Sequence, residues 1–320
     1  MDLNASIFVA GGTTPIGRAL LERLRAEGYR RLVGVPPDEP DLTDAGRVAA
    51  FFSWARPQYV FLAAGKSGGI GANQNRPADL MLDNLLVAAH VIAEASRSGV
   101  AKLLYLASSC SYPRLAPQPM RPEALLTGPL EPTNDAYAVA KLAGWKLCQA
   151  YRRQCGAPFI TAIPANSFGP FDDFSPENGH VIPALMRRMH EAKMRNEEAV
   201  VVWGTGRPVR EFLYVRDLAD ACLFAMRRYD GDEPLNLGSG SEISIKETAR
   251  LIAAVVGYRG RIVFDTSRPD GMPRKALDAE PLSALGWKPS TDFRAALEET
   301  YAWFRTHEVT EDPHHVRAAV

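Results

Sequence analysis

Residues 7 to 17 read IFVAGGTTPIG, a short apolar run that ends in a glycine-bearing turn. A strand that is buried on both faces of a parallel sheet is continuously apolar, as Ile7 to Ala10 are. Apolar residues then recur at helical spacing, at Ile16, Leu20, Leu21 and Leu24. The stretch therefore predicts a strand, a tight turn and a helix whose N-terminus faces the turn and can hold a pyrophosphate.

The same alternation continues through the first half of the chain. Further strand-like apolar runs lie at residues 31–35, 59–62, 103–106 and 159–163, and helical patterns lie at residues 45–52, 77–99 and 135–154. Regular alternation of strands and helices predicts an α/β fold with a doubly wound parallel sheet. Beyond Asn166 the chain becomes loop-rich, with a helix expected over residues 182–192 and a strand over 200–203.

This change of pattern predicts two lobes and a tail. We expect a dinucleotide-binding domain over residues 1–165 plus about 211–235. We expect a smaller C-terminal substrate lobe from residues 166–210 and 236–306. Residues 307–320, which include His314 and His315, show no periodic pattern, and we interpret them as a frayed end or surface extension rather than a metal site.

Charge and cysteine content limit the possible partners and the compartment. The 37 Lys and Arg residues balance 37 Asp and Glu residues, so no global charge favours nucleic acid or an anionic membrane. No apolar run approaches the ~20 residues that span a bilayer, and the N-terminus has no export pattern. The four cysteines form no Cys-x-x-Cys metal pair or dense disulfide framework. We therefore expect a cytoplasmic protein with reduced thiols and no metal.

Tyr137 and Lys141 are spaced to share one face of the helix expected over residues 135–154. A neighbouring ammonium favours the phenolate, so we expect Lys141 to lower the pKa of Tyr137 and make the pair a proton donor and acceptor. The spacing alone is also typical of ordinary surface helices. The glycine turn before it, LLYLASSC at residues 103–110 and PANSFGP at residues 164–170 strengthen the functional interpretation.

In this order, these motifs resemble the extended short-chain dehydrogenase/reductase family, whose members have a Rossmann fold. The resemblance covers roughly residues 5 to 305 and is strongest for members that act on GDP-4-keto-6-deoxy sugars. The stretches that carry it are AAGKSGGI (63–70), SSCSYP (108–113), LEPTN (130–134), HVIPAL (180–185), VWG (202–204), REFL (210–213) and PDGMPRK (269–275).

The resemblance implies a nicotinamide cofactor, with NADPH expected ahead of NADH. The residues implied to bind the cofactor are Gly11, Thr14, Gly17, Asp41, Lys141, Asn166 and His180. Two departures weaken the preference for NADPH. The family's Gly-x-x-Gly-x-x-Gly has a threonine at its second glycine, and the arginines that contact the 2′-phosphate in resembling enzymes are replaced by Thr13 and Pro37.

The resemblance also implies two chemistries. Ser108, Tyr137 and Lys141 serve reduction at C4, because an oxyanion formed there must be protonated and stabilised. Cys110 and His180 serve epimerisation at C3 and C5 as an acid/base pair acting on opposite faces. The residues implied to bind the GDP-sugar are Arg188, Trp203, Arg210 and Arg274.

Other interpretations stay open. The long helix expected over residues 77–99 packs against its copy in relatives, so we expect a homodimer, although the core explains its apolar residues equally well. The chain is alternatively a reductase or an epimerase alone, acting on a related GDP-linked keto-heptose or keto-dideoxy sugar. A non-catalytic dinucleotide-binding regulator is a third possibility, but a sensor does not need Ser108, Tyr137, Lys141, Cys110 and His180.

Overall fold

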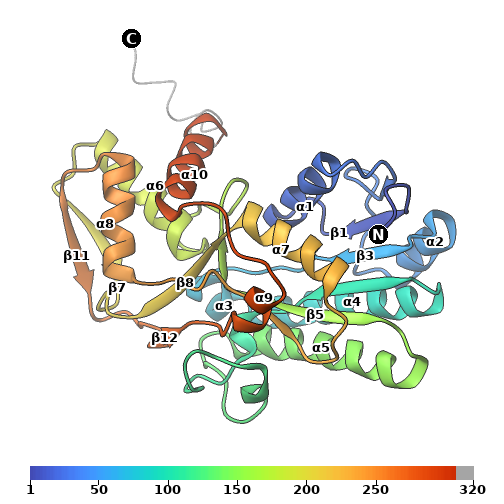
Figure 1. Ribbon diagram of the computed structural model, residues 1–320. Helices are drawn as coiled ribbons and strands as arrows, with labels where there is room; N and C mark the ends of the chain where they lie inside the picture. Colours follow the sequence, from blue (N-terminus) through green and yellow to red (C-terminus); the bar gives the residue numbers. More distant parts are fainter. Residues whose placement is uncertain (308–320) are drawn as a thin grey trace.

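The computed structural model describes residues 1–307, and its centre is a parallel six-stranded sheet (Figure 1). The strand order is β2-β1-β3-β4-β5-β9. The bounds are Leu32–Val33 for β2, Ile7–Ala10 for β1, Tyr59–Leu62 for β3, Lys102–Leu106 for β4, Phe159–Pro164 for β5 and Leu235–Leu237 for β9. All five pairings are parallel, so the predicted doubly wound sheet is confirmed.

Helices cover both faces of this sheet (Figure 1). On one face α1 (Pro15–Ala26) packs against α7 (Val215–Arg228). On the other face α4 (Pro77–Arg97) packs against α5 (Asp135–Cys155) and α2 (Ala45–Ala55). Because both faces are covered, β1 is buried and apolar throughout, and β4 is buried after its first residue, Lys102.

The second half of the chain builds smaller sheets beside the first. Strand β8 (Val209–Tyr214) pairs with β6 (Asn166–Phe168), β10 (Glu242–Ser244) and β12 (Arg274–Lys275). Strand β7 (Ala199–Trp203) pairs with β11 (Arg261–Asp265). Besides α7, the helices of this half are α6 (Val181–Met194), α8 (Ile245–Val256), α9 (Glu280–Ala284) and α10 (Phe293–His307). Their position beside the sheet supports the two-lobe division, which stays our proposal.

Local differences from the sequence expectation are small. The segment expected to be a flexible loop over residues 65–71 is a loop up to residue 69, and a short helix, α3 (Ile70–Asn75), begins at its end. Two 3-10 turns, η1 (Ser109–Ser111) and η2 (Pro122–Ala124), follow β4. The predicted strand over residues 31–35 is shorter in the structure, where it forms β2.

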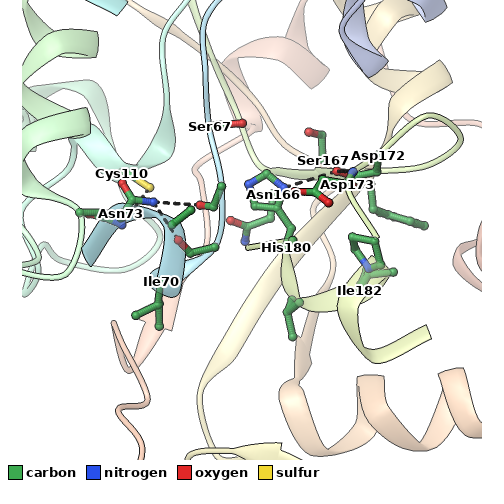
Figure 2. A pocket seen from close by; sticks show the side chains of 18 of the residues that line it. Ser67, Ile70, Asn73, Cys110, Asn166, Ser167, Asp172, Asp173, His180 and Ile182 are labelled. Atoms are coloured by element: carbon green, nitrogen blue, oxygen red, sulfur yellow. Dashed lines mark hydrogen bonds and ion pairs between the residues drawn. The ribbon is translucent and has the colours of Figure 1, made fainter. Parts of the chain in front are cut away.

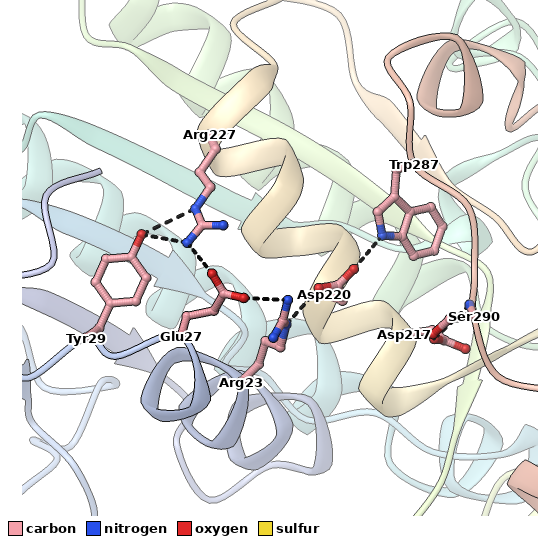
Figure 3. Close-up of polar contacts among 8 residues, drawn as sticks. All are labelled: Arg23, Glu27, Tyr29, Asp217, Asp220, Arg227, Trp287 and Ser290. Atoms are coloured by element: carbon pink, nitrogen blue, oxygen red, sulfur yellow. Dashed lines mark hydrogen bonds and ion pairs between the residues drawn. The ribbon is translucent and has the colours of Figure 1, made fainter.

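A polar network fastens α7 and the C-terminal segment to the first helix (Figure 3). Asp220 of α7 accepts hydrogen bonds from Arg23 Nε at 2.7 Å and from Trp287 Nε1 at 2.8 Å. Arg227 pairs with Glu27 at 2.8 Å at the far end of α7. Although α7 comes late in the sequence, these contacts attach it to α1, the helix that follows the glycine turn.

Within residues 1–307, no helix is both long enough and apolar enough to cross a membrane. The predicted tail, with His314 and His315, lies outside the described residues apart from His307, the last residue of α10.

Candidate active site

A cavity of about 790 Å³ lies where the carboxyl ends of β3, β4 and β5 meet the second half of the chain. Ligands bind at this edge of open α/β sheets. Figure 2 shows residues from both sides reaching into it, among them Cys110, Asn166 and His180. The cavity brings together all five predicted catalytic residues and most of the predicted binding residues, namely Ser108, Cys110, Tyr137, Lys141 and His180, with Thr14, Asn166, Arg188, Trp203 and Arg210.

Ser108 follows the end of β4 and starts the turn that carries Cys110. Its side chain accepts a hydrogen bond from the backbone N–H of Cys110 at 3.2 Å, because a serine at the cap of a short helical turn satisfies a free amide. Ser108 is buried and lines the cavity together with Tyr137. The strand end therefore holds the hydroxyl and the thiol side by side.

Tyr137 and Lys141 lie on the cavity side of α5, but the expected effect of the lysine on the tyrosine is wrong in this structure. Burial raises the pKa of Tyr137, the charge of Cys110 raises it further, and the hydrogen bond with Ser108 only partly opposes this. Lys141 Nζ lies 6.0 Å from the centroid of the Tyr137 ring and donates to the carbonyl oxygen of Leu106 at 3.1 Å. Lys141 does not offset the effect of burial, so the phenol of Tyr137 stays protonated at neutral pH.

Burial also changes the lysine itself. Lys141 is 6% exposed, and burial lowers its pKa to about 8. Loss of hydration disfavours the charged ammonium, since the carbonyl of Leu106 offers only a dipole in exchange. Lys141 can therefore exchange a proton near neutral pH, which suits a group that resupplies Tyr137.

Cys110 differs from Tyr137, because its pKa is lowered although it is buried. Burial raises the pKa of its thiol, but the nearby Lys275 ammonium, the hydrogen bond with Ser108 and the charge of His180 together bring the net pKa below its ordinary value. Lys275 Nζ lies 3.2 Å from Cys110 Sγ, and Asn134 Nδ2 lies 3.3 Å from the same sulfur. The sulfur thus faces two nitrogen donors that favour a thiolate.

His180 stands at the N-terminal cap of α6, and its side chain is 42% exposed. Desolvation and the charge of Lys275 lower the pKa of the imidazole, but the pairing with Asp172 and the charge of Cys110 outweigh them, so the net pKa lies above its ordinary value. Nδ1 of His180 lies 3.5 Å from Oδ1 of Asp172 (Figure 2). The site therefore holds a thiol, Cys110, whose lowered pKa favours the basic thiolate, and an imidazole, His180, whose raised pKa favours the acidic imidazolium.

The glycine turn is shaped by close backbone contacts. Gly11 has φ +92°, and a side chain at Gly17 would place its Cβ only 1.9 Å from the carbonyl oxygen of Gly11. Thr14 caps α1, because its hydroxyl donates to the Gly11 carbonyl at 2.8 Å and accepts from the Gly17 N–H at 3.0 Å. The unexpected threonine thus takes a local structural role while still lining the cavity.

The amides of this turn already have an acceptor within the protein. The backbone N–H groups of Gly11 and Gly12 both donate to the carboxylate of Glu39, the second at 3.1 Å. Sequence patterns did not single out Glu39, which lies two residues after Pro37 in the loop that follows β2. The carboxylate ties the loop after β2 to the turn.

Basic side chains reach the far side of the cavity. Arg188 donates to the carbonyl of Val201 at 3.0 Å and lies 5.9 Å from the ring centroid of Trp203. Arg210 donates to the carbonyls of Val209 at 2.9 Å and Asp270 at 3.3 Å. Both guanidinium groups are bonded only to backbone oxygens in these contacts, so their charges stay available to an anionic ligand.

Four predicted binding residues do not line the cavity: Gly11 and Gly17 shape the turn beside it, whereas Asp41 and Arg274 make their contacts elsewhere. Asp41 is exposed and accepts hydrogen bonds from Thr43, at 2.9 Å from its N–H and 2.7 Å from its hydroxyl. Arg274 pairs with Glu242 at 2.6 Å on the surface. Successive side chains of a strand point to opposite faces, so within β12 it is Lys275, not Arg274, that enters the cavity. The binding roles of Asp41 and Arg274 stay predictions that the geometry does not favour.

Known proteins with a similar sequence or structure extend this description. Residues 7–238 match the model of the NAD dependent epimerase/dehydratase family. The chain is 52% identical over 303 residues to GDP-L-fucose synthase 1 of Arabidopsis thaliana, with 95% of this chain and 94% of the relative covered.

Two solved structures are similar over nearly the whole chain. A GDP-6-OMe-4-keto-L-xylo-heptose reductase from C. jejuni has a TM-score of 0.91 at 32% identity, covering 96% of this chain and 99% of that one. A GDP-L-fucose synthetase from Naegleria fowleri, bound to NADP, has a TM-score of 0.88 at 31% identity, covering 97% of each chain. The fold, the cavity and these matches agree: the chain belongs to the NAD dependent epimerase/dehydratase family, as its resemblance to extended short-chain dehydrogenases/reductases indicated.

Proposed function

We propose that this protein is a GDP-L-fucose synthase, which epimerises a GDP-4-keto-6-deoxyhexose at C3 and C5 and reduces it at C4 with NADPH. The observation that carries the proposal is that one cavity contains both sets of groups. Ser108, Tyr137 and Lys141 suit reduction, and Cys110 and His180 suit epimerisation. The 52% identity to a GDP-L-fucose synthase of Arabidopsis thaliana supports the same substrate class.

Epimerisation needs a base and an acid on opposite faces of the sugar. A proton α to the C4 ketone moves to the Cys110 sulfur, and the carbonyl oxygen takes the charge while Ser108 and Tyr137 donate hydrogen bonds to it. His180 then gives a proton to the same carbon from the other side. Each inversion leaves a thiol and a neutral imidazole, and proton exchange with water restores both groups. Solvent hydrogen therefore enters the product.

Reduction uses the other set of groups. A bound dihydronicotinamide supplies the hydride to C4. Tyr137 donates its proton to the C4 oxygen, and its raised pKa ensures that the phenol carries that proton at neutral pH. Lys141, whose pKa is about 8, resupplies the proton to Tyr137.

The residues around the cavity fit a dinucleotide. Thr14, Pro15 and Ile16 put the N-terminus of α1 at the rim, where a helix end favours a pyrophosphate. In this proposal Lys141 would contact the ribose of the nicotinamide half, and Asn166 and His180 would contact the nicotinamide side. The hydrogen bond from Asn166 to the carbonyl of Glu211 at 3.0 Å supports a fixed position for the Asn166 side chain.

Arg188, Trp203 and Arg210 provide the proposed site for the GDP part of the substrate. Two guanidinium groups can pair with a diphosphate, and an indole offers a flat apolar surface. We further propose that the protein is a homodimer and works in the cytoplasm. The four free cysteines, Cys110, Cys148, Cys155 and Cys222, support a reducing compartment.

The test is product analysis by NMR after incubation with GDP-4-keto-6-deoxy-mannose and either NADPH or NADH. The proposal predicts an L-configured GDP-6-deoxyhexose whose C3 and C5 positions carry deuterium when the reaction runs in heavy water. An unreduced or unepimerised product with both cofactors would contradict it.

The alternative is a reductase or epimerase alone on a related GDP-sugar. The structural similarity to a GDP-linked keto-heptose reductase favours the reductase form of this alternative. Heavy water separates the two possibilities, because a simple reductase incorporates no solvent hydrogen at C3 or C5.

A further inference from the structure

Lys275 is a cation that reaches the cavity without a carboxylate partner. It is 9% exposed. Its Nζ contacts the sulfur of Cys110 at 3.2 Å and the amide oxygen Oδ1 of Asn166 at 3.3 Å. Among residues 1–307 no Asp or Glu forms an ion pair with it, whereas its neighbour Arg274 is paired with Glu242. Taking an ammonium out of water is costly unless an anion lies beside it.

Cys110 is the group that can supply that anion. Asn134, at the N-terminal cap of α5, adds a second nitrogen donor at 3.3 Å from the same sulfur. A neutral thiol is a weak acceptor and gains little from two donors, whereas a thiolate accepts both strongly. The two donors come from elements far apart in sequence, α5 and β12, and meet only at this sulfur.

Backbone pairing holds Lys275 in place. It lies opposite Arg210 in the parallel pairing of β12 with β8. The alternation of side chains along β12 directs Arg274 to the surface and Lys275 to the cavity. The ammonium therefore does not have to move to meet the sulfur.

We propose that Lys275, assisted by Asn134, holds Cys110 as a thiolate in the free protein, so that the base of the epimerisation is formed before a substrate arrives. Lys275 acts here as a positioning residue through Cys110. The catalytic meaning of this inference rests on the proposed function, but the state of the thiol does not.

Other charged groups act on Cys110 as well. The charge of His180 favours the thiolate, and the charge of Cys110 in turn raises the pKa of Arg210 and of Tyr137. Glu131 acts on Arg210. Lys275 Nζ contacts the sulfur directly at 3.2 Å, so Lys275 is expected to have the largest single effect of these charged groups.

The experiment measures the alkylation of Cys110 by iodoacetamide as a function of pH in the free protein, read by peptide mass spectrometry. The midpoint of the profile reports the thiol–thiolate equilibrium and requires neither substrate nor cofactor. Lys275→Met is compared with wild type, with Lys275→Arg, which keeps the charge, and with Arg274→Met, which removes the neighbouring exposed charge.

For Lys275→Met we expect the midpoint to rise by at least about one pH unit, so that alkylation at pH 7 slows about tenfold. Lys275→Arg should keep most of the wild-type profile, and Arg274→Met should keep all of it. An unchanged midpoint in Lys275→Met overturns the inference, and so does an equal shift in Arg274→Met. If Lys275→Met does not fold, Lys275→Gln gives the same decision, since it keeps a donor without the charge.

The outcome separates this inference from the proposed function. A raised midpoint supports the lysine–thiolate pair even if no sugar nucleotide is turned over. An unchanged midpoint in a protein that still incorporates deuterium at C3 and C5 leaves the proposed function intact and removes only the role of Lys275.

Discussion

Two lysines lie beside two proton-transferring groups in one cavity, and they affect those groups differently. Lys275 touches the sulfur of Cys110 at 3.2 Å, and the pKa of the thiol falls despite burial. Lys141 lies 6.0 Å from the ring centroid of Tyr137, its Nζ hydrogen-bonded to the carbonyl of Leu106, and the pKa of the phenol rises because burial prevails. Of these two lysines, the one that hydrogen-bonds the titrating atom is the one that offsets the effect of burial.

The difference matches the two tasks. A group that removes a proton from carbon must be ionised before the reaction, and a group that protonates an oxyanion must not be. Contact with a cation favours the first state, and burial without such contact favours the second. The same cavity can therefore hold a ready base and a ready acid.

The largest expected effect concerns the buried acid. Tyr137→Phe removes the proton donor and keeps the ring, so reduction at C4 should fall by about two to four orders of magnitude. Oxidation of NADPH, followed by absorbance, measures it. Deuterium uptake at C3 and C5 should be affected much less, because Cys110 and His180 remain. Near-normal reduction by the variant would contradict the assignment.

The next-largest effect concerns Cys110, the proposed base, which Lys275 contacts. Cys110→Ser replaces the thiol by an alcohol that is far less acidic, so deuterium uptake at C3 and C5 should fall by at least about two orders of magnitude. The variant should still bind cofactor and reduce the unepimerised ketone, giving a D-configured product. Mass spectrometry reads the label. Uptake at the wild-type rate would show that the sulfur is not the base, and the matched control Cys148→Ser should leave uptake unchanged.

The third prediction tests whether contact with Asp172 controls the pKa of His180, the proposed acid of the epimerisation. Burial lowers the pKa of His180, but contact with Asp172 raises it above its ordinary ~6.5. Exchange needs the imidazolium, so the rate falls as pH rises through this pKa. Asp172→Asn should move that basic limb to lower pH and slow exchange at pH 8 about tenfold.

The matched control is Asp173→Asn on the same loop. Its carboxylate accepts from the N–H of Ser175 at 2.8 Å instead of contacting His180. A shift of the pH profile in the control as large as that in Asp172→Asn would mean that the loop, rather than the charge on Asp172, controls His180.

The smallest effect concerns a missing contact. Thr13 and Pro37 occupy the positions where resembling enzymes carry arginines, so neither side chain offers a positive charge to the 2′-phosphate of NADPH. We expect the kcat/KM values for NADPH and NADH to differ by less than about a hundredfold, and Pro37→Arg to raise the preference for NADPH about tenfold. A wild-type preference above a hundredfold would mean that another residue recognises the phosphate.

Some of this site could be predicted from local sequence because its physical cause is local. The apolar run of β1, the helical spacing of α1 and the four-residue interval between Tyr137 and Lys141 depend on neighbours within a few residues. The strand and helix positions of the first half follow from such patterns. The family resemblance added Cys110 and His180, and the cavity contains both.

The roles of individual side chains were decided by distant contacts. Nothing in the order Arg274-Lys275 says which of the two faces the cavity, because that depends on how β12 pairs with β8. Glu39 and Asn134 gained their partners in the same way, from segments brought together by folding.

By itself, the sequence determined the doubly wound sheet and the edge of that sheet where the cavity lies, because periodicity and strand order act through local backbone geometry. Tertiary structure alone decided the protonation states of the residues in the cavity. The pKa of Tyr137 rises, that of Lys141 falls to about 8 and that of Cys110 falls, because desolvation and charge contact are properties of the folded surroundings, which no spacing along the chain encodes.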